Sequence, residues 1–373
     1  MRADSEGFDY PVINHETCTE CGLCVRICPI SNHWNNPATF DFPQVFAAYH
    51  QSERVRSKSA SGGIFPALAQ SVLEDKGMVF GAAFDEHFRL SHIGVETETE
   101  LGPLIGSKYV QSRIGAAFKE VKNVLKRNKP VLFTGTPCQI VGLYNFLQRD
   151  DDHLFTCDLI CHGVPSPKVF QKYIGYLEES HNSKVIQYKF RSKYFGWHSY
   201  GIQITFANGK IINTTNQQDP YTIGFLDNLF LRPICSICPY TSLHRHADIT
   251  IGDFWGIEKY MPELNDNKGV SAILVNTAKG SRLFEGCQSL ILTRQSEVQQ
   301  VIQPSLVSPS IPSSHRASFF ADLDRLSFGD VQRIYISGFL PTIRRKIIQY
   351  KHAILNFVQK KSRRPRERVK VAV

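Results

Sequence analysis

The residues best suited to chemistry in this sequence are cysteines. The segment 18–29 reads CTECGLCVRICP, so that four cysteines are separated by two, two and three residues and a proline follows the last one. Thiolates at this spacing can wrap one face of an iron–sulfur cubane, and Gly22 leaves room for backbone N–H groups beside the sulfurs. We therefore predict a 4Fe–4S cluster. Its candidate ligands are Cys18, Cys21, Cys24 and Cys28.

The fourth ligand of this cluster is open. In ferredoxins with two clusters, the fourth cysteine of each run binds the other cluster, and this chain contains a single run. Cys28 closes its own cluster, or a distant thiol such as Cys157 or Cys287 contributes, or a preceding ferredoxin half is absent from the chain. The alternative to iron is a zinc knuckle or a group of reduced core cysteines.

A second group of cysteines follows the predicted buried strands. Loops after consecutive parallel strands converge at one edge of a sheet, where open α/β folds bind their ligands. We therefore predict a four-thiolate cage formed by Cys138, Cys161, Cys235 and Cys238. Taken alone, the C-x2-C pair would equally suit half a zinc site or a redox dithiol. Cys157, with the strand parity of a core residue, and Cys287, late on a helix, are expected to be buried structural cysteines.

Three loops rich in glycine and serine have the composition of a nucleotide or flavin pocket. SASGG (59–63) opens a predicted helix, GSKYVQS spans 106–112, and GTP (135–137) ends a predicted strand. Such a loop at a helix N-terminus offers backbone donors to a pyrophosphate. The chain has neither a G-x-G-x-x-G fingerprint nor a Walker A motif, which disfavours an ordinary dinucleotide-binding half and an ATPase. Each loop taken singly would suit a tight turn.

Two side chains are candidate catalytic groups. Lys108 could neutralise a phosphate or donate toward a flavin ring, where a cation stabilises the reduced anion. His162, beside Cys161, could relay protons or donate a hydrogen bond near the cysteine cage. His244 and His246 are expected at the surface. Because the sequence shows no Ser-His-Asp set and no H-E-x-x-H motif, hydrolysis is not supported.

Alternating strands and helices between residues 50 and 290 must position these loops. Apolar runs predict strands at 78–84, 131–135, 154–160, 247–254 and 270–276, and one-sided apolar periodicity predicts helices at 64–76, 114–128 and 168–180. This alternation implies crossover connections and a largely parallel sheet, hence an α/β fold of mixed character. Stretches 185–191, 200–209 and 210–215 alternate around Asn208-Gly209, which predicts an inserted β-hairpin.

Composition and charge narrow the class of protein. The chain of 373 residues is 42% hydrophobic and 21% charged, which excludes disordered, collagenous and coiled-coil classes. No apolar run approaches the roughly 18 residues of a bilayer span, and the start lacks a signal peptide, so we expect a cytoplasmic protein with reduced cysteines. The formal charge of +9 resides in residues 341–373, which carry eleven Lys and Arg against Glu367.

This basic tail has two interpretations. The first is a solvated, partly disordered charge run. The second is attraction to an anionic membrane surface, which would place the protein peripherally at the inner membrane face. The stretch 336–359 could form a basic amphipathic helix. Specific nucleic-acid binding is disfavoured, because the tail holds no Phe, Trp or Tyr besides Tyr350 and Phe357 and the rest of the chain is close to neutral.

The ordered motifs together resemble one known family. The ferredoxin run is followed by SKSASGG, GSKYVQS, GTPCQ, DLICHGVPSP, FRSKYFGW and a C-x2-C pair before ADITIGDFWG. This series is similar to the coenzyme F420 hydrogenase/dehydrogenase beta-subunit family over residues 7 to 290. The segment GFDYPVINHETC resembles the linker that joins two ferredoxin halves in that family, with the first half missing upstream of Met1. Two interpretations follow: the assigned start truncates the chain, or the protein has one cluster fewer than the family.

The resemblance implies an iron–sulfur flavoprotein with FAD and one or two 4Fe–4S clusters. It implies electron transfer between a reduced carrier, of the deazaflavin F420 or ferredoxin type, and an acceptor, with F420 as a possible substrate and a partner oxidoreductase subunit. Many bacterial members are associated with surface-polysaccharide synthesis. Carried over by motif, the flavin contacts would be Ser61, Gly62, Gly63, Gly106, Ser107, Lys108, Tyr109, Gly135, Thr136 and Pro137.

The predicted organisation is a ferredoxin-like segment (1–45), an FAD- and iron–sulfur-binding α/β domain (46–295), an extension (296–340) and the basic tail (341–373). Two other function classes stay open. One is a non-catalytic electron-relay or assembly subunit that binds clusters without a substrate pocket. The other is a zinc-stabilised α/β binding protein, which would hold zinc and show no visible absorption band.

Overall fold

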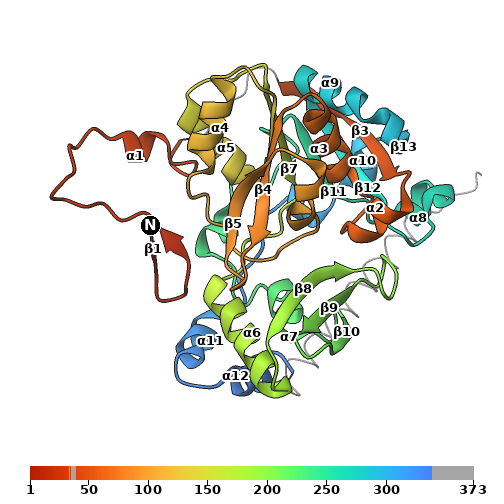
Figure 1. The fold of residues 1–373 in the computed structure, drawn as a ribbon. Coiled ribbons are helices and arrows are strands. Elements are labelled where there is room, and N and C mark those ends of the chain that lie inside the picture. Colours follow the sequence, from red (N-terminus) through yellow and green to blue (C-terminus); the bar gives the residue numbers. More distant parts are fainter. Residues whose placement is uncertain (33, 35–38, 338–373) are drawn as a thin grey trace, which may run out of the picture.

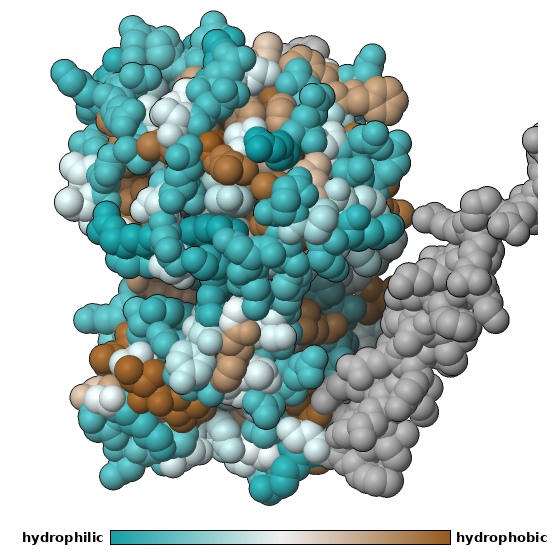
Figure 2. Space-filling model, turned by 90° about the vertical axis from the view of Figure 1, so that its right-hand side faces the viewer, coloured by the Kyte–Doolittle hydropathy of each residue, from teal (hydrophilic) through white to brown (hydrophobic). Residues whose placement is uncertain are grey.

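The computed structural model describes residues 1–32, 34 and 39–337 (Figure 1). The basic tail therefore lies outside the described residues, as does the helix predicted at 336–359 beyond Ser337. Two units stand one above the other in Figure 1, and the space-filling view shows them meeting at a narrower waist under a mostly hydrophilic surface (Figure 2). No helix in the described part of the chain is long and apolar enough to cross a bilayer.

The upper unit is built on an eight-stranded sheet. The strand order across the sheet is β13 (Ile291–Ser296), β3 (Thr39–His50), β12 (Ser271–Thr277), β11 (Ile249–Asp253), β7 (Leu154–Leu159), β6 (Val131–Gly135), β4 (Met78–Phe84) and β5 (Leu90–Val95). The four strands β11, β7, β6 and β4 are parallel neighbours, and the flanking pairs are antiparallel. The predicted mixed α/β fold is confirmed.

Helices cover both faces of this sheet. α3 (Ile64–Glu74) and α9 (Ala278–Gly286) pack on the face that carries Val79 and Leu132. α4 (Ala117–Leu125) and α5 (Pro137–Leu147) pack on the opposite face, over the neighbouring residues Phe80 and Phe133. Successive strand residues point to opposite faces, so strands covered on both sides read as continuous apolar runs, which is why 78–84 and 131–135 could be predicted.

The lower unit contains the predicted hairpin. β8 (Val185–Ser192), β9 (Gly201–Phe206) and β10 (Ile211–Thr215) form a three-stranded antiparallel sheet, and the turn uses Gly209 at φ 84°. Four helices surround a core rich in aromatic side chains, and this core also takes in Phe8 from the N-terminal segment. These helices are α6 (Pro167–His181), α7 (Pro220–Leu226), α11 (Arg316–Leu323) and α12 (Phe328–Tyr335).

β3 is the longest strand described, and the sequence did not predict it. β3 starts at Thr39 and runs through the boundary placed between residues 45 and 46. It contains Pro43, which cannot donate to a ladder and lies where the pairing with β12 changes register. The other elements are β1 (Arg2–Ala3), β2 (Asp9–Tyr10), α1 (Leu23–Arg26), α2 (Glu53–Lys58), α8 (Ile257–Tyr260) and α10 (Val298–Val301).

Candidate functional site

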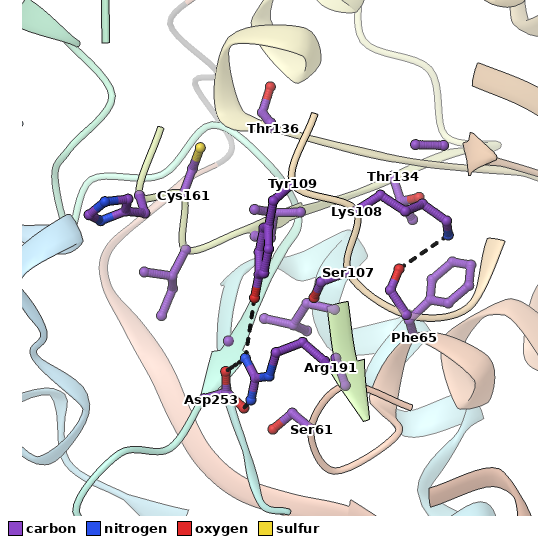
Figure 3. A pocket seen from close by; sticks show the side chains of 18 of the residues that line it. Ser61, Phe65, Ser107, Lys108, Tyr109, Thr134, Thr136, Cys161, Arg191 and Asp253 are labelled. Atoms are coloured by element: carbon purple, nitrogen blue, oxygen red, sulfur yellow. Dashed lines mark hydrogen bonds and ion pairs between the residues drawn. The ribbon is translucent and has the colours of Figure 1, made fainter. Parts of the chain in front are cut away.

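A cavity of about 460 Å³ opens at the carboxyl ends of the parallel strands, between the two units (Figure 3). The loops after β6 and β7 line it from the sheet, and Arg191, Tyr200 and Phe225 line it from the lower unit. The three loops rich in glycine and serine meet here. Of the predicted flavin contacts, the lining includes Ser61, Gly63, Gly106, Ser107, Lys108, Tyr109, Gly135 and Thr136.

Gly62 and Pro137 lie outside this lining, for different reasons. The Gly62 N–H donates to Ser271 Oγ at 2.9 Å, and a Cβ on Gly62 would stand 2.4 Å from the carbonyl oxygen of Ala48. Gly62 therefore lets the SASGG loop pack against the sheet. Pro137 is buried in the first turn of α5, where its missing N–H costs nothing.

Two helices begin at the cavity. α3 follows Gly63, which adopts a left-handed φ of 88°, and α5 follows Thr136; both residues line the cavity. The unpaired N–H groups and partial positive charge of a helix start favour phosphate oxygens. The start of α3, which has no side-chain cap, fits the pyrophosphate of a flavin dinucleotide better than the start of α5, where Pro137 and a capping box leave fewer free donors. Apolar side chains such as Phe65 and Leu104 are available to the rest of the molecule.

Lys108 contributes a basic group to the cavity (Figure 3). Its Nζ donates to the carbonyl oxygens of Ile105 at 3.3 Å and Gly106 at 3.1 Å. Burial lowers the pKa of Lys108 to about 7, because the charged amine loses water without gaining a carboxylate. The amine is therefore protonated below neutral pH and neutral above it.

This pKa can be tested by competitive acetylation with acetic anhydride, followed by mass spectrometry of the peptides. Only the neutral amine reacts, so we expect acetylation of Lys108 to rise with a midpoint near pH 7. Lys119, an exposed residue on α4, serves as the reference amine. Parallel pH profiles for the two lysines would contradict the burial argument.

Three polar side chains in the cavity were not singled out from the sequence. His92 donates from Nε2 to the Thr134 carbonyl at 3.0 Å and accepts at Nδ1 from Ser112 at 3.1 Å, and burial lowers its pKa to about 4. The other two, Arg191 and Asp253, form a bidentate ion pair at 2.7 and 3.0 Å (Figure 3). Arg191 also lies over the Tyr200 ring, 4.1 Å from its centre.

The sequence signals for these residues differ. Arg191 and Asp253 belong to the motifs FRSKYFGW and ADITIGDFWG, so the motifs contained them without revealing that the two meet. His92 stands in no motif. Its hydrogen bonds join β5 to β6 and to the loop at Ser112, and such a partnership depends on tertiary packing.

His162 lines the same cavity and is held by a hydrogen bond. Its Nε2 donates to Asn228 Oδ1 at 2.7 Å, and its ring meets Phe225 edge-on. Burial lowers the pKa of His162 below its ordinary value, while Asn228 opposes that shift. This places the neutral imidazole at the cavity wall directly beside Cys161.

The structure brings the four cysteines of the predicted cage together. Burial raises the pKa of the Cys161 thiol well above its ordinary value, and Cys235, Cys138 and Cys238 raise it further through their charges. Cys161 also lines the cavity (Figure 3). In the described part of the chain, no three His, Cys, Asp or Glu side chains stand at the spacing of a single-ion site. A 4Fe–4S cluster spreads its thiolates more widely because each binds a different iron.

Each of these sulfurs has a hydrogen-bond donor. The donor pairs are the N–H of Gly163 with Cys161, the N–H of Val164 with Cys235, the N–H groups of Tyr240 and Thr241 with Cys238, and the Thr136 hydroxyl with Cys138 at 3.1 Å. Donors aimed at sulfur stabilise thiolates over thiols. Four thiols supplied with donors fit the ligand set of an iron–sulfur cluster.

A buried ion pair holds the loop that carries Cys235 and Cys238. Arg245 donates to Asp158 at 2.8 Å and to the carbonyl oxygens of Tyr240 and Ser242, so it joins the loop to the end of β7. Only 2% of the Arg245 side chain and none of the Asp158 side chain are exposed.

The cysteines of the N-terminal run are more open to solvent. Cys18, Cys21 and Cys24 are exposed on and before α1, whereas Cys28 is partly buried. The chain next to Cys28 is docked on the upper unit: the Tyr240 hydroxyl donates to the Pro29 carbonyl, and Asn145 on α5 donates to the Asn32 carbonyl.

Tyr240 lies between the two cysteine groups. Burial raises the pKa of its hydroxyl, and the thiols of Cys138, Cys238 and Cys28 raise it further. One phenol is therefore within electrostatic reach of both groups, so the predicted N-terminal cluster would adjoin the cage.

Cys157 and Cys287 are buried structural cysteines, as predicted. Both belong to the apolar core between the sheet and helices α3 and α9. The Cys157 thiol donates to the Asp158 carbonyl, and the Cys287 thiol donates to the Phe284 carbonyl. Neither belongs to the cysteine groups described above. Of the two histidines expected at the surface, His244 is exposed and His246 is partly buried.

Comparison with known proteins adds four findings: one relative, one solved structure and two family models. Over 282 residues the chain is 24% identical to an uncharacterized protein of Methanocaldococcus jannaschii, and the alignment covers 71% of this chain and 69% of the relative. A chain of the F420-reducing NiFe hydrogenase complex from Methanosarcina barkeri aligns with a TM-score of 0.48 and 17% identity, over 82% of this chain and 97% of that one.

Two family models match separate parts of the chain. Residues 11–31 match a 4Fe–4S binding domain, which covers the whole N-terminal cysteine run. Residues 128–299 match the model for the C-terminal part of the coenzyme F420 hydrogenase/dehydrogenase beta subunit, and this range contains Cys138, Cys161, Cys235 and Cys238. Residues 128–299 therefore carry the C-terminal region of the coenzyme F420 hydrogenase/dehydrogenase beta-subunit family.

Proposed function

We propose that this protein is an iron–sulfur flavoprotein that moves electrons between an organic redox carrier and a one-electron acceptor. The observation that carries the proposal is that Cys161 belongs to two sites at once. This residue lines the cavity and also belongs to the group of four cysteines. A flavin seated in the cavity would therefore adjoin a cluster ligand.

The residues divide into three binding sets. The start of α3 would bind the pyrophosphate of FAD, and Lys108 would face its anionic part. Cys138, Cys161, Cys235 and Cys238 would bind one 4Fe–4S cluster, and Cys18, Cys21, Cys24 and Cys28 a second. When bound, FAD exchanges an electron pair with an organic partner, whereas each cluster carries one electron at a time.

The polypeptide supplies the surroundings that this chemistry needs. The cavity wall is partly apolar and excludes water around Lys108 and His92, and both remain largely uncharged above neutral pH. His162 holds a hydrogen at Nε2, bonded to Asn228, and Lys108 carries an exchangeable proton near pH 7. Lys108 and His162 are accordingly the groups that we propose for proton transfer at the cavity.

The carrier is proposed from the family name alone to be the deazaflavin F420, with ferredoxin as the alternative. The role in surface-polysaccharide synthesis stays a prediction. Reduced F420, reduced ferredoxin and NADH can each be mixed anaerobically with the FAD-loaded protein. Bleaching of the flavin band by one of the first two, and not by NADH, would support the proposal. A protein that binds neither flavin nor iron would refute it.

A relay subunit is the second candidate, and one feature favours it. The N-terminal cysteines are exposed among apolar side chains that are also exposed, including Val12, Ile13, Leu23 and Val25. Such a surface suits transient docking of a redox partner. Turnover of a carrier by the isolated chain with an artificial one-electron acceptor would argue against a relay subunit, whereas electron transfer only in the presence of a partner subunit would support it.

A further inference from the structure

The four cysteines of the cage receive their hydrogen bonds from two kinds of donor. Cys161, Cys235 and Cys238 are served by backbone N–H groups, which accompany almost any side chain. Cys138 is served by the hydroxyl of Thr136, whose Oγ1 lies 3.1 Å from the sulfur. This is the donor to the cage that a substitution can remove without altering the backbone.

Neighbouring residues fix the position of the Thr136 hydroxyl. Thr136 caps α5 in a capping box with Gln139, whose Oε1 accepts from the Thr136 N–H at 2.9 Å. The Gln139 Nε2 donates to Ser112 Oγ at 2.9 Å, and Ser112 in turn donates to His92. A continuous hydrogen-bonded chain therefore runs from the His92 imidazole to the Cys138 sulfur.

Two acceptors compete for the Thr136 hydrogen. One is Gln139 Oε1 at 3.1 Å, which already accepts from the Thr136 N–H. The other is Cys138 Sγ. A cysteine that binds iron is a thiolate, and a buried anion attracts a donor more strongly than a neutral amide oxygen that already has a partner. The hydroxyl should therefore turn to the sulfur when iron is bound.

We propose that Thr136 is a positioning residue that sets the reduction potential of the cluster at Cys138, Cys161, Cys235 and Cys238. The inference rests on the proposed function, because it requires that cluster. Uptake of one electron from a reductant such as dithionite makes the cluster and its thiolates more negative. A hydrogen bond to the sulfur stabilises this reduced form more than the oxidised form, so it moves the potential in the positive direction.

The test is an EPR-monitored redox titration of anaerobically prepared protein. The signal of this cluster is identified as the one that disappears in Cys161→Ala. Thr136→Val replaces the hydroxyl by a methyl group of similar size, and we expect its midpoint potential to shift to more negative values. Thr136→Ser keeps the hydroxyl and should titrate like the wild type.

Two further variants complete the test. Thr134→Val removes a hydroxyl from the same strand end, but Thr134 donates to the Phe80 carbonyl, so its potential should match the wild type. Gln139→Leu removes the competing acceptor, and we expect its potential to shift in the positive direction, opposite to Thr136→Val. If Thr136→Val binds no cluster, the midpoint potential of Gln139→Leu still tests the role of Thr136.

The possible results distinguish the role of Thr136 from the proposed function on which that role rests. Opposite shifts in Thr136→Val and Gln139→Leu, with Thr136→Ser unchanged, would support the role of Thr136. Wild-type potentials in all loaded variants would overturn it while leaving the proposed function intact. A wild-type protein without any EPR signal that depends on Cys161 would instead refute the cluster itself.

Discussion

Replacing Cys161 by alanine is expected to remove one of two clusters, and with it about four iron atoms and four sulfides per chain. The reason is that Cys161 lies within electrostatic reach of Cys138, Cys235 and Cys238, so its removal takes away one of the four proposed ligands of the cage. Iron and sulfide assays on anaerobically purified protein measure the loss directly. If FAD binds as we propose, its absorption band should remain, because the start of α3 is unchanged.

Cys287→Ala is the matched control. Cys287 is fully buried in the apolar core between α3, α9 and the sheet, away from the cage. The control should keep the wild-type iron content and lose only packing, at a cost of about 1 kcal/mol for a small buried side chain. Equal iron content in Cys161→Ala and Cys287→Ala would contradict the assignment of the cage.

Replacing Arg245 by methionine is expected to lower the free energy of unfolding by about 3–5 kcal/mol, the usual cost of leaving one partner of a buried ion pair without its counter-charge. Arg245 is the cation beside the fully buried Asp158, and burial already raises the pKa of that carboxyl. Urea unfolding under anaerobic conditions gives the change. Iron release to a chelator should also accelerate, because Arg245 holds the loop of Cys238 through the carbonyl oxygens of Tyr240 and Ser242.

Two further variants show whether the unpaired buried charge of Asp158 causes the loss of stability. Arg325→Met removes an arginine whose pair with Asp322 is largely exposed, and it should change stability by less than about 1 kcal/mol. Adding Asp158→Asn to Arg245→Met removes the stranded charge and should recover part of the loss. An Arg245→Met protein as stable as Arg325→Met would show that the buried pair does not support the loop.

Much of the fold could be predicted where strands are covered on both faces. The runs at 78–84, 131–135 and 154–160 are mostly apolar, with Thr134, Thr156 and Asp158 as the exceptions, and their strands β4, β6 and β7 have nearly the predicted bounds. β3 escaped prediction because Pro43 interrupts it. β5 and β13 escaped because they lie at the two edges of the sheet and mix polar with apolar residues, which leaves no clean alternation.

The candidate site could likewise be predicted from the sequence only in part. The meeting of Cys138 and Cys161 follows from a general rule, since both come directly after neighbouring parallel strands. The Arg191–Asp253 pair and the imidazole of His92 follow from no such rule. Arg191 belongs to the lower unit and Asp253 to the sheet, so their contact depends on how the two units pack, which local periodicity does not encode.

Crystals grown without oxygen and measured at the iron absorption edge would show directly whether the four cysteines hold a cluster beside a flavin. We expect anomalous iron density enclosed by Cys138, Cys161, Cys235 and Cys238, with flavin density in the cavity that Cys161 lines. Zinc at these four thiols, or no metal among them in crystals of freshly purified protein, would contradict it.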